Sequence, residues 1–218
     1  MTKSARIKRF YEELHREFGP QGWWPAETAF ECILGAVLTQ STSWKNVEKA
    51  IDNLRRGNLI SVEGINSITA DELALLIRPS GYYNQKAIKI KNFISFLVNE
   101  FSGSLDSMFA TEKSHLRKKL LSIKGIGPET ADSIMLYAGG IPVFVVDTYT
   151  WRVLLRHGLV PEVTSYDEIQ EIFTDSLQED AGMFNEYHAL LVRLAKDHCR
   201  KNNPVCAGCP LEYDPHTA

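Results

Sequence analysis

Apolar residues recur along most of this chain at intervals of three and four, which is the spacing of helices that bury one face. The stretches 30–38 and 190–195 show this spacing, and a third runs through Ile88, Phe93, Phe96, Leu97 and Phe101. Capping boxes at 69–72 and 165–168 mark two helix starts, because a hydroxyl and a carboxylate there satisfy orphan backbone donors. Glycine and proline fall between these segments, and we find no alternating strand pattern. The pattern predicts an all-α protein.

The composition is that of an ordinary globular protein. With 218 residues, 44% of them hydrophobic, the chain suits one large domain or two small ones. No apolar run approaches the ~20 residues that cross a bilayer, and the N-terminal segment lacks the apolar core of a signal peptide. We therefore expect a cytoplasmic protein, associated with the nucleoid if the cell is prokaryotic, without membrane contact. In that compartment clustered cysteines indicate a metal centre, since disulfides are rare.

Charge is unevenly distributed along the chain. The net charge of −3 and the isoelectric point near 6.1 do not by themselves indicate a nucleic-acid-binding protein. Basic residues nevertheless gather in three clusters, at 3–9, 86–91 and 113–124, whereas the segment between Arg156 and Arg193 is acidic and carries no Lys or Arg. Most of these charges are expected to be solvated helix surface. The third cluster adjoins a glycine-rich turn and favours contact with phosphates.

That turn, Gly125-Ile126-Gly127, follows an apolar run and precedes Pro128, which is tolerated in the first position of a helix. A helix, a hairpin and a second helix leave backbone N–H groups directed outward at the positive end of a helix dipole, which suits an anion such as a phosphodiester. Alone this is a weak signal, because a plain turn between two helices is the commoner explanation. It is sharpened by a lone acid, Asp147, which lies twenty residues after Gly127.

Together these segments resemble the helix-hairpin-helix DNA glycosylases of the endonuclease III superfamily. The hairpin corresponds to 120–131, and 145–160 resembles the segment that carries the family's catalytic aspartate. The likeness extends over nearly the whole chain, from 29–44 through 80–87 to the cysteines near the C-terminus.

The resemblance implies two helical lobes with the DNA cleft between them. Residues 27–138 would form a six-helix barrel lobe that ends in the helix-hairpin-helix motif, at about 112–138. Residues 1–26 and 139–218 would form a second lobe of N- and C-terminal helices, with the cysteine loop 199–215.

The resemblance assigns the catalytic role to Asp147. Cleavage of an N-glycosidic bond passes through a cationic sugar, which a carboxylate stabilises, and the same carboxylate can orient or deprotonate a water. On residue type alone Asp147 would be a helix N-cap. The two roles are compatible, because a capping position fixes the carboxylate rigidly.

Family members that also nick the backbone have a lysine in the second helix of the hairpin, which attacks the sugar and forms a Schiff base. The matching position here is Glu129, which cannot form an imine. The sequence therefore indicates a monofunctional hydrolase with water as the nucleophile. Glu129 also suits the first turn of a helix electrostatically. Lys124 is an alternative amine, although we expect it to contact phosphate.

The combination of WWP at 23–25, LTQSTSW at 38–44, SGYYNQKA at 80–87 and Glu129 is most similar to the 3-methyladenine DNA glycosylase branch. Its aromatic, nearly uncharged pocket would here be formed by Trp24, Pro25 and Trp44. A flipped base is gripped by stacking, and a π face attracts a cationic alkylpurine over a neutral base. The competing interpretation is that these tryptophans fill core or interfaces.

The resemblance also assigns DNA contacts. Gln40 lies where the family inserts a side chain into the gap left by the flipped nucleotide, and Tyr82 lies where a second wedge enters the opposite strand. A surface glutamine and a half-buried tyrosine are the default alternatives. The hairpin would contact the backbone through Lys124, Gly125, Gly127 and Thr130.

Cys199, Cys206 and Cys209 match three positions of the C-x6-C-x2-C-x5-C loop that holds a [4Fe–4S] cluster in much of this superfamily. The fourth position is Pro215, so His216, Asp214 or solvent would complete the set. Three outcomes compete: a cluster with an unusual fourth ligand, zinc held by three cysteines and a histidine, and a metal-free remnant. The fourth cysteine, Cys32, is predicted to be a buried small hydrophobe.

The sequence thus predicts a base excision DNA N-glycosylase, monofunctional and directed at alkylated purines, that acts as a monomer on double-stranded DNA. The first alternative is an endonuclease III-like glycosylase for oxidised or mismatched bases with weak abasic-site lyase activity. A different class, a non-catalytic DNA-binding protein that uses the same hairpin, is the second.

Overall fold

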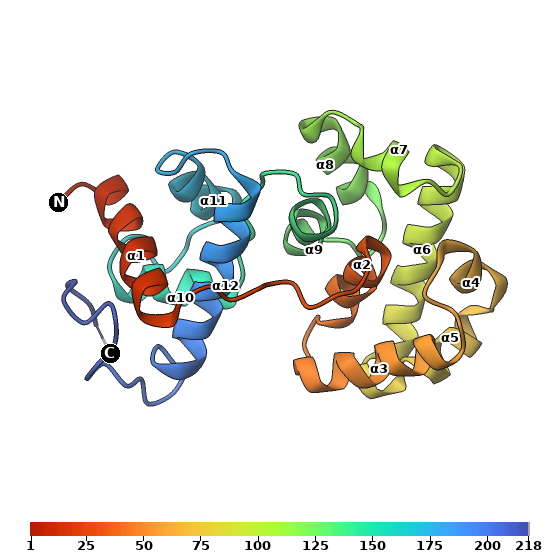
Figure 1. Cartoon of the computed structure of the whole chain (residues 1–218), viewed down its shortest axis with the longest axis horizontal. Coiled ribbons are helices and arrows are strands. Elements are labelled where there is room, and N and C mark those ends of the chain that lie inside the picture. Colours follow the sequence, from red (N-terminus) through yellow and green to blue (C-terminus); the bar gives the residue numbers. More distant parts are fainter. Residues whose placement is uncertain (218) are drawn as a thin grey trace. The chain divides into compact units, whose positions relative to one another are not determined.

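The computed structural model describes residues 1–217, which form helices joined by loops and contain no strand (Figure 1). The all-α prediction is confirmed. Contacts divide the chain into two compact units, of which the first comprises Met1–Trp24 and Pro142–Ala218 and the second Pro25–Ile141. Among the described helices, none has the length and apolar content that a bilayer crossing requires.

The second unit is organised around α2 (Ala29–Leu38), which is buried along its length from Phe30 to Leu38. A helix that is apolar on all sides must be covered on all sides, and α2 packs against α3, α6, α9 and the π-helical turn that follows α9. The other elements of this unit are α3 (Trp44–Arg56), α4 (Val62–Ser67), α5 (Ala70–Leu76), a 3-10 turn (Arg78–Ser80), α6 (Tyr83–Phe101), α7 (Leu105–Phe109), α8 (Lys113–Ser122), α9 (Pro128–Ser133) and the π-helical turn (Ile134–Ala138).

The long helix α6 packs against α2, α4, α5 and α7 (Figure 1). Two members of the stripe predicted from the sequence, Phe93 and Leu97, are buried, whereas Ile88 is 53% exposed. Ile90 and Ile94, which the stripe did not include, complete the buried face. The predicted capping boxes of α5 and of α11 (Tyr166–Thr174) are both present, with each hydroxyl and glutamate bonded reciprocally.

The first unit consists of α1 (Lys3–Phe18), α10 (Thr148–Arg156), α11 (Tyr166–Thr174) and α12 (Ala181–Asp197). The helix α12 packs against α1 and α10, and α1 also packs against α11. Its core is a cluster of aromatic rings in which Phe144 stacks on Phe173 at 3.8 Å and meets Phe184 and Tyr187 edge to face. The Tyr187 hydroxyl donates to the Ile7 carbonyl at 2.9 Å, which ties α1 to this core.

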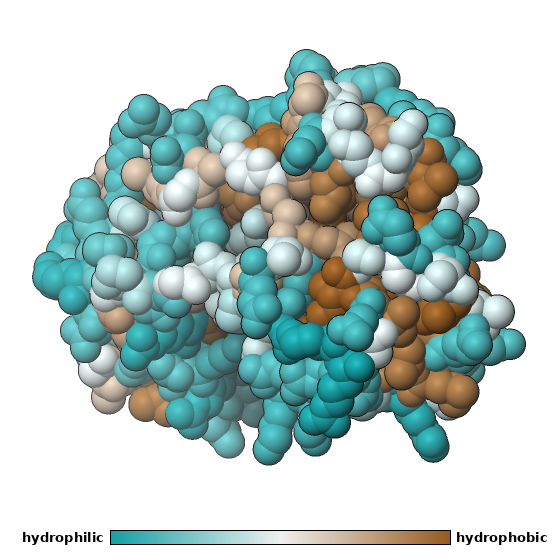
Figure 2. Space-filling view, turned by 45° about the vertical axis from the view of Figure 1, so that its right-hand side comes forward, coloured by the Kyte–Doolittle hydropathy of each residue, from teal (hydrophilic) through white to brown (hydrophobic). Residues whose placement is uncertain are grey.

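Some apolar side chains remain at the surface. In the second unit Leu75 is 70% exposed and Val98 is 38% exposed. Figure 2 shows apolar atoms on the forward face interrupted by polar and charged side chains. Single exposed apolar residues of this kind are normal in soluble folds and do not by themselves mark a docking surface.

The aromatic cluster yields a stability prediction. Replacing Phe144 with alanine removes a stacked ring from a core that is closed on all sides, and we expect the free energy of unfolding to fall by about 3–5 kcal/mol. Urea denaturation followed by circular dichroism measures this change. The matched control is Val163→Ala, since Val163 is 92% exposed and its truncation should change stability by less than about 0.5 kcal/mol. Equal losses for the two variants would contradict the assigned core.

Candidate active site

Asp147 is the N-cap of α10, as its residue type predicts. Its backbone is extended, and its Oδ1 accepts a hydrogen bond from the Thr150 N–H at 2.8 Å. The preceding residues 143–146 are all buried, and Val153 and Leu154 bury the inner face of α10. Apolar burial on both sides of the cap therefore fixes the position of the carboxylate.

His188 of α12 faces this carboxylate. Its Nε2 lies 3.6 Å from Asp147 Oδ2, and the two side chains are 6% and 13% exposed. No motif in the sequence marks His188 as a site residue. The only available signal was a polar residue within the apolar stripe of α12, and such histidines usually pack into the core. Oδ1 is thus used for capping, while Oδ2 faces an imidazole.

The environment keeps Asp147 ionised. Burial acts to raise the pKa of this carboxyl, but the facing imidazole of His188 and the hydrogen bonds at the start of α10 outweigh it, so the pKa lies below its ordinary value. A carboxylate at neutral pH can stabilise a developing cation or accept a proton from water.

The hairpin lies in the second unit, between α8 and α9. Gly125 has φ +99°, and a side chain there would place Cβ 2.5 Å from Lys89 Cγ, so both the conformation and the close approach of α6 require glycine. The Asn92 amide of α6 also donates to the Lys124 carbonyl at 2.9 Å. Gly127 differs, since its backbone is extended and a Cβ there would meet nothing within 4 Å.

The predicted DNA-contacting residues of the hairpin differ in exposure. Lys124 and Glu129 are exposed, whereas Thr130 is only 5% exposed. In the basic cluster that precedes the hairpin, Arg117 is paired with the buried Asp132 at 2.8 Å. This arginine therefore has a structural role within the second unit.

Gln40 is held by two side chains of the same unit. Its Nε2 donates to Thr130 Oγ1 at 2.8 Å, and its Oε1 accepts from Lys89 Nζ. The predicted wedge is therefore half-buried against α9 in this structure. Thr130, assigned to DNA contact by resemblance, serves here as the acceptor for Gln40.

Tyr82 is 69% exposed and precedes α6 in the left-handed conformation, with φ +45°. Lys86 lies one turn further on, and it is 2% exposed although the sequence placed it in a basic surface cluster. Its Nζ donates to the carbonyls of Leu38 and Ser80 at 2.8 and 2.7 Å. Lys86 thus joins the loop that follows α2, with Gln40, to the loop that carries Tyr82.

The three predicted pocket residues are partly or fully accessible. Trp24 and Trp44 are half-buried, Pro25 is exposed, and none of them fills a core. Trp24 ends a segment of the first unit, whereas Pro25 and Trp44 belong to the second unit. The Trp44 indole N–H donates to Glu48 Oε1 at 3.0 Å, which orients its ring on the first turn of α3.

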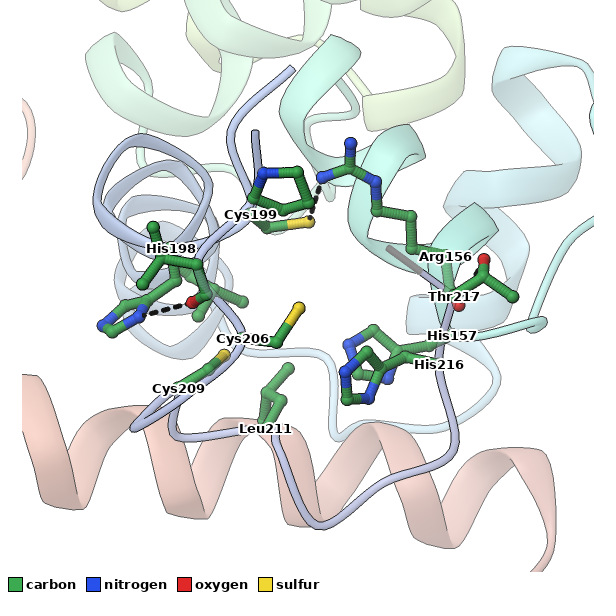
Figure 3. Close-up of a pocket in the computed structure, with 12 residues that line it drawn as sticks. Arg156, His157, His198, Cys199, Cys206, Cys209, Leu211, His216 and Thr217 are labelled. Carbon is green, nitrogen blue, oxygen red and sulfur yellow. Dashed lines mark hydrogen bonds between the residues drawn. The ribbon is translucent and has the colours of Figure 1, made fainter. Parts of the chain in front are cut away.

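The cysteines of the C-terminal loop line a single pocket of the first unit, with about 340 Å³ of empty space that is partly open to solvent (Figure 3). Cys199, Cys206 and Cys209 share it with His157 and His216, and burial raises the pKa of the Cys209 thiol. Cys32 lies apart on α2, is 3% exposed and has a pKa raised to about 12 by burial, as expected of a small hydrophobe.

Comparison with protein families decides the identity of this fold. Residues 34–179 match the model of the HhH-GPD superfamily of base excision DNA repair proteins. The chain belongs to this superfamily. Among curated relatives, it is 47% identical over 213 residues to a protein of Methanocaldococcus jannaschii that is named, provisionally, a DNA repair glycosylase. That match covers 97% of this chain and 96% of the relative.

Solved structures of this superfamily share the fold. The Helicobacter pylori 3-methyladenine DNA glycosylase bound to 1,N6-ethenoadenine aligns with a TM-score of 0.74 and 29% identity, over 90% of this chain and 98% of that one. A non-covalent endonuclease III–DNA complex aligns with a TM-score of 0.83 and 22% identity, over 99% and 96%. This HhH-GPD chain is therefore a base excision repair DNA glycosylase, an enzyme that cleaves N-glycosidic bonds.

The buried lysine of this glycosylase yields a pH prediction. Burial, followed by the charge of Lys89, lowers the pKa of Lys86 from 10.5 to about 8. Between these values the unfolded chain binds more protons at this site than the folded chain does, so stability rises with pH. A neutral amine can still donate to both carbonyls.

We therefore expect wild type to gain up to roughly 3 kcal/mol relative to Lys86→Met between about pH 8 and pH 10.5. Urea denaturation at a series of pH values measures this difference. The matched control is Lys91→Met, because Lys91 is on the same helix and also donates to a carbonyl, that of Ile65, at 2.8 Å. If wild type and Lys86→Met change in parallel with pH, the ammonium is not buried as described.

Proposed function

We propose that this glycosylase is monofunctional and hydrolyses alkylated purines of the 3-methyladenine type from double-stranded DNA, as a monomer. One observation carries the proposal: a fixed carboxylate, Asp147, is held ionised at the start of α10, while the hairpin presents Glu129 where a lyase would need an amine. Water is then the nucleophile.

The chemistry requires little beyond this carboxylate. As the alkylated base departs, the electron pair of the C1′–N bond moves onto the base and neutralises its positive charge. Asp147 stabilises the cationic sugar that remains. Water then forms a bond to C1′, and its proton passes to the carboxylate. A neutral leaving group needs no general acid, which agrees with a site built on one carboxylate.

His188 is proposed as the positioning residue for Asp147. Because Oδ1 is bonded to the backbone of α10, the remaining orientation of the carboxylate is set from the side of Oδ2, where Nε2 of His188 lies at 3.6 Å. Both residues belong to the first unit, so their relation does not depend on the placement of the second.

The preference for alkylpurines rests on the aromatic residues. Trp24 and Trp44 are half-buried and lie outside the buried cores, and the ring of Trp24 packs edge to face on Trp23, so we assign both rings to stacking on the base. A cationic base gains cation–π attraction that an undamaged base lacks. The likeness to the Helicobacter pylori enzyme, named for 3-methyladenine and bound to an ethenoadenine, supports the same class of substrate.

The hairpin is proposed to bind the DNA backbone. Nothing within the protein requires glycine at position 127, so we attribute it to the approach of an external group to the backbone N–H. Lys124 is exposed beside it and suited to a phosphate. Gln40 and Tyr82, whose loops Lys86 joins, are proposed to enter the duplex, which requires Gln40 to exchange its partners Thr130 and Lys89.

We propose a structural [4Fe–4S] cluster in the cysteine pocket. The spacing of Cys199, Cys206 and Cys209 matches three positions of the loop that holds such a cluster in much of this superfamily, and all three thiols line the pocket. Within residues 1–217 no group of three His, Cys, Asp or Glu side chains is positioned to hold a single metal ion, so the proposal rests on the cysteine spacing and on the three thiols that line the pocket. When bound, the cluster would supply cross-linking of the loop, and no step of base release needs it.

The function is tested by release of 3-methyladenine and 7-methylguanine from methylated duplex DNA under single turnover. We expect wild type to release base without nicking, and Asp147→Asn to be slower by roughly 10²–10⁴-fold. Asparagine is an equally good N-cap, so this variant keeps the fold. Borohydride should trap no adduct between wild type and abasic DNA.

The remaining outcomes separate the alternatives. A trapped adduct would replace the monofunctional proposal with a lyase that uses an amine such as Lys124. Release of oxidised or mismatched bases, without release of alkylpurines, would contradict the substrate class alone. Base release unaffected by Asp147→Asn would contradict the catalytic assignment.

His188 gives a separate prediction. We expect His188→Ala to slow single-turnover release roughly tenfold to a hundredfold, because an unrestrained carboxylate is misplaced. His188→Gln should recover part of the rate, since its amide can reach the carboxylate, and the rate should follow a different pH profile from that of wild type. His15→Ala, in the same unit and distant in sequence from α10, is the control. An unchanged rate and pH profile in His188→Ala would contradict the positioning role.

A further inference from the structure

The segment that follows the cysteines is fixed along the wall of their pocket. The Thr217 N–H donates to the Arg156 carbonyl at 2.8 Å, which attaches the segment to the end of α10. Three residues earlier, Asp214 is 2% exposed and bonded to two other parts of the unit. His216 lies between these two anchors and lines the pocket with the cysteines (Figure 3).

Both carboxylate oxygens of Asp214 take part in this anchoring. Arg6 of α1 donates to Oδ1 from Nε at 2.9 Å and to Oδ2 from Nη2 at 2.5 Å, while His157 Nδ1 lies 2.8 Å from Oδ2. With both oxygens engaged, Asp214 is a poor candidate for a metal ligand.

The backbone of Asp214 orients His216. The His216 Nδ1 lies 2.7 Å from the Asp214 carbonyl oxygen. A carbonyl oxygen only accepts, so Nδ1 must carry the proton and Nε2 keeps its lone pair. Metal-ligating histidines are typically set in this way, with the second ring nitrogen bonded to a carbonyl or carboxylate.

The two other histidines that line the pocket, His157 and His198, also have Nδ1 at an acceptor, so their ring placement and chain position must separate them from His216. The His198 ring stacks on Phe18, with centroids 6.3 Å apart, and in Figure 3 it is turned away from the sulfurs. The His157 ring is fixed by the carboxylate of Asp214 and packs edge to face on Phe10 at 5.0 Å. It belongs to the buried network that holds the segment, and only His216 follows the cysteines on the same loop.

We propose that His216, through Nε2, is the fourth ligand of the cluster in place of a cysteine, and that Asp214 is its positioning residue. This inference rests on the cluster proposed above for the same pocket. A neutral imidazole in place of a thiolate makes the cluster site less negative by one charge, and Arg156, whose Nη1 lies 3.3 Å from Cys199 Sγ, acts in the same direction. Histidine ligation raises the reduction potential of such centres.

The experiment uses the full chain, expressed in cells grown in medium that contains iron and purified under anaerobic conditions. Iron and acid-labile sulfide are quantified first. The reduced protein, labelled with ¹⁵N-histidine, is then examined by electron–nuclear double resonance, and the potential is measured by redox titration. The variants are His216→Ala and His216→Cys, with His198→Ala as the matched control because it lines the same pocket and its Nδ1 also meets a carbonyl, that of Val205, at 3.1 Å.

We expect about four irons per chain in wild type, with a nitrogen coupling that survives in His198→Ala. His216→Cys should keep the cluster, lose the coupling and shift the potential to a more negative value. His216→Ala should lose the coupling and convert to a three-iron form on mild oxidation.

The two proposals fail in distinguishable ways. A wild-type protein without iron and sulfide overturns the cluster itself. A full cluster without nitrogen coupling, or one whose coupling and potential do not change in His216→Cys, overturns only the histidine ligand. A further variant, His157→Ala, tests the neighbouring histidine. If the nitrogen coupling is lost in His157→Ala and kept in His216→Ala, the ligand is His157 and the proposal for His216 is wrong. None of these readouts depends on base release.

Discussion

The stacking of Phe144 on Phe173 determines where the first unit places its one candidate catalytic group. Phe144 is buried in the aromatic core, and three residues later the chain reaches Asp147 at the start of α10. Over so short a distance an extended backbone has little freedom, so the position of the ring fixes that of the carboxylate. Tyr187, which meets both Phe144 and Phe173 edge to face in the same cluster, directly precedes His188. One core therefore positions both members of the proposed pair, and a carboxylate fixed in this way needs no reorganisation when positive charge develops on a sugar.

The second unit uses buried polar contacts for a related purpose. Two backbone carbonyls, of Leu38 at the end of α2 and of Ser80 before α6, are joined by the ammonium of Lys86. Burying a lysine is costly, and burial lowers the pKa of Lys86 to about 8. What its two hydrogen bonds provide is a fixed geometry for the loops that bear Gln40 and Tyr82. The left-handed backbone of Tyr82 fits this view, since strained residues gather where a structure holds a functional side chain.

Local sequence signals were sufficient for the helices and for the N-cap. The buried stripe of α2, both capping boxes and Asp147 depend on spacing or on residues within one turn, and all were predicted. The errors concern tertiary contacts. Ile88 satisfies the helical spacing but faces solvent, and Lys86 resembles a surface charge but points inward, because the neighbours of α6 decide which face is covered. His188 lies 41 positions from its partner Asp147, and Gln40 lies 90 positions from Thr130. No spacing rule connects residues so far apart in the sequence.

The same distinction between local and tertiary information underlies the choice of His216 as the proposed fourth ligand. Pro215 removes a ligand from the loop, and the local sequence offers Asp214 and His216 on equal terms. The tertiary structure separates them, since Arg6 and His157 take up the carboxylate and leave the imidazole directed at the pocket. The ionic anchor also fixes the segment without any metal, because its partners come from α1 and α10. A segment anchored in this way would tolerate the exchange of a thiolate for an imidazole, since the fold itself orients the proposed ligand and no cluster is needed to order it.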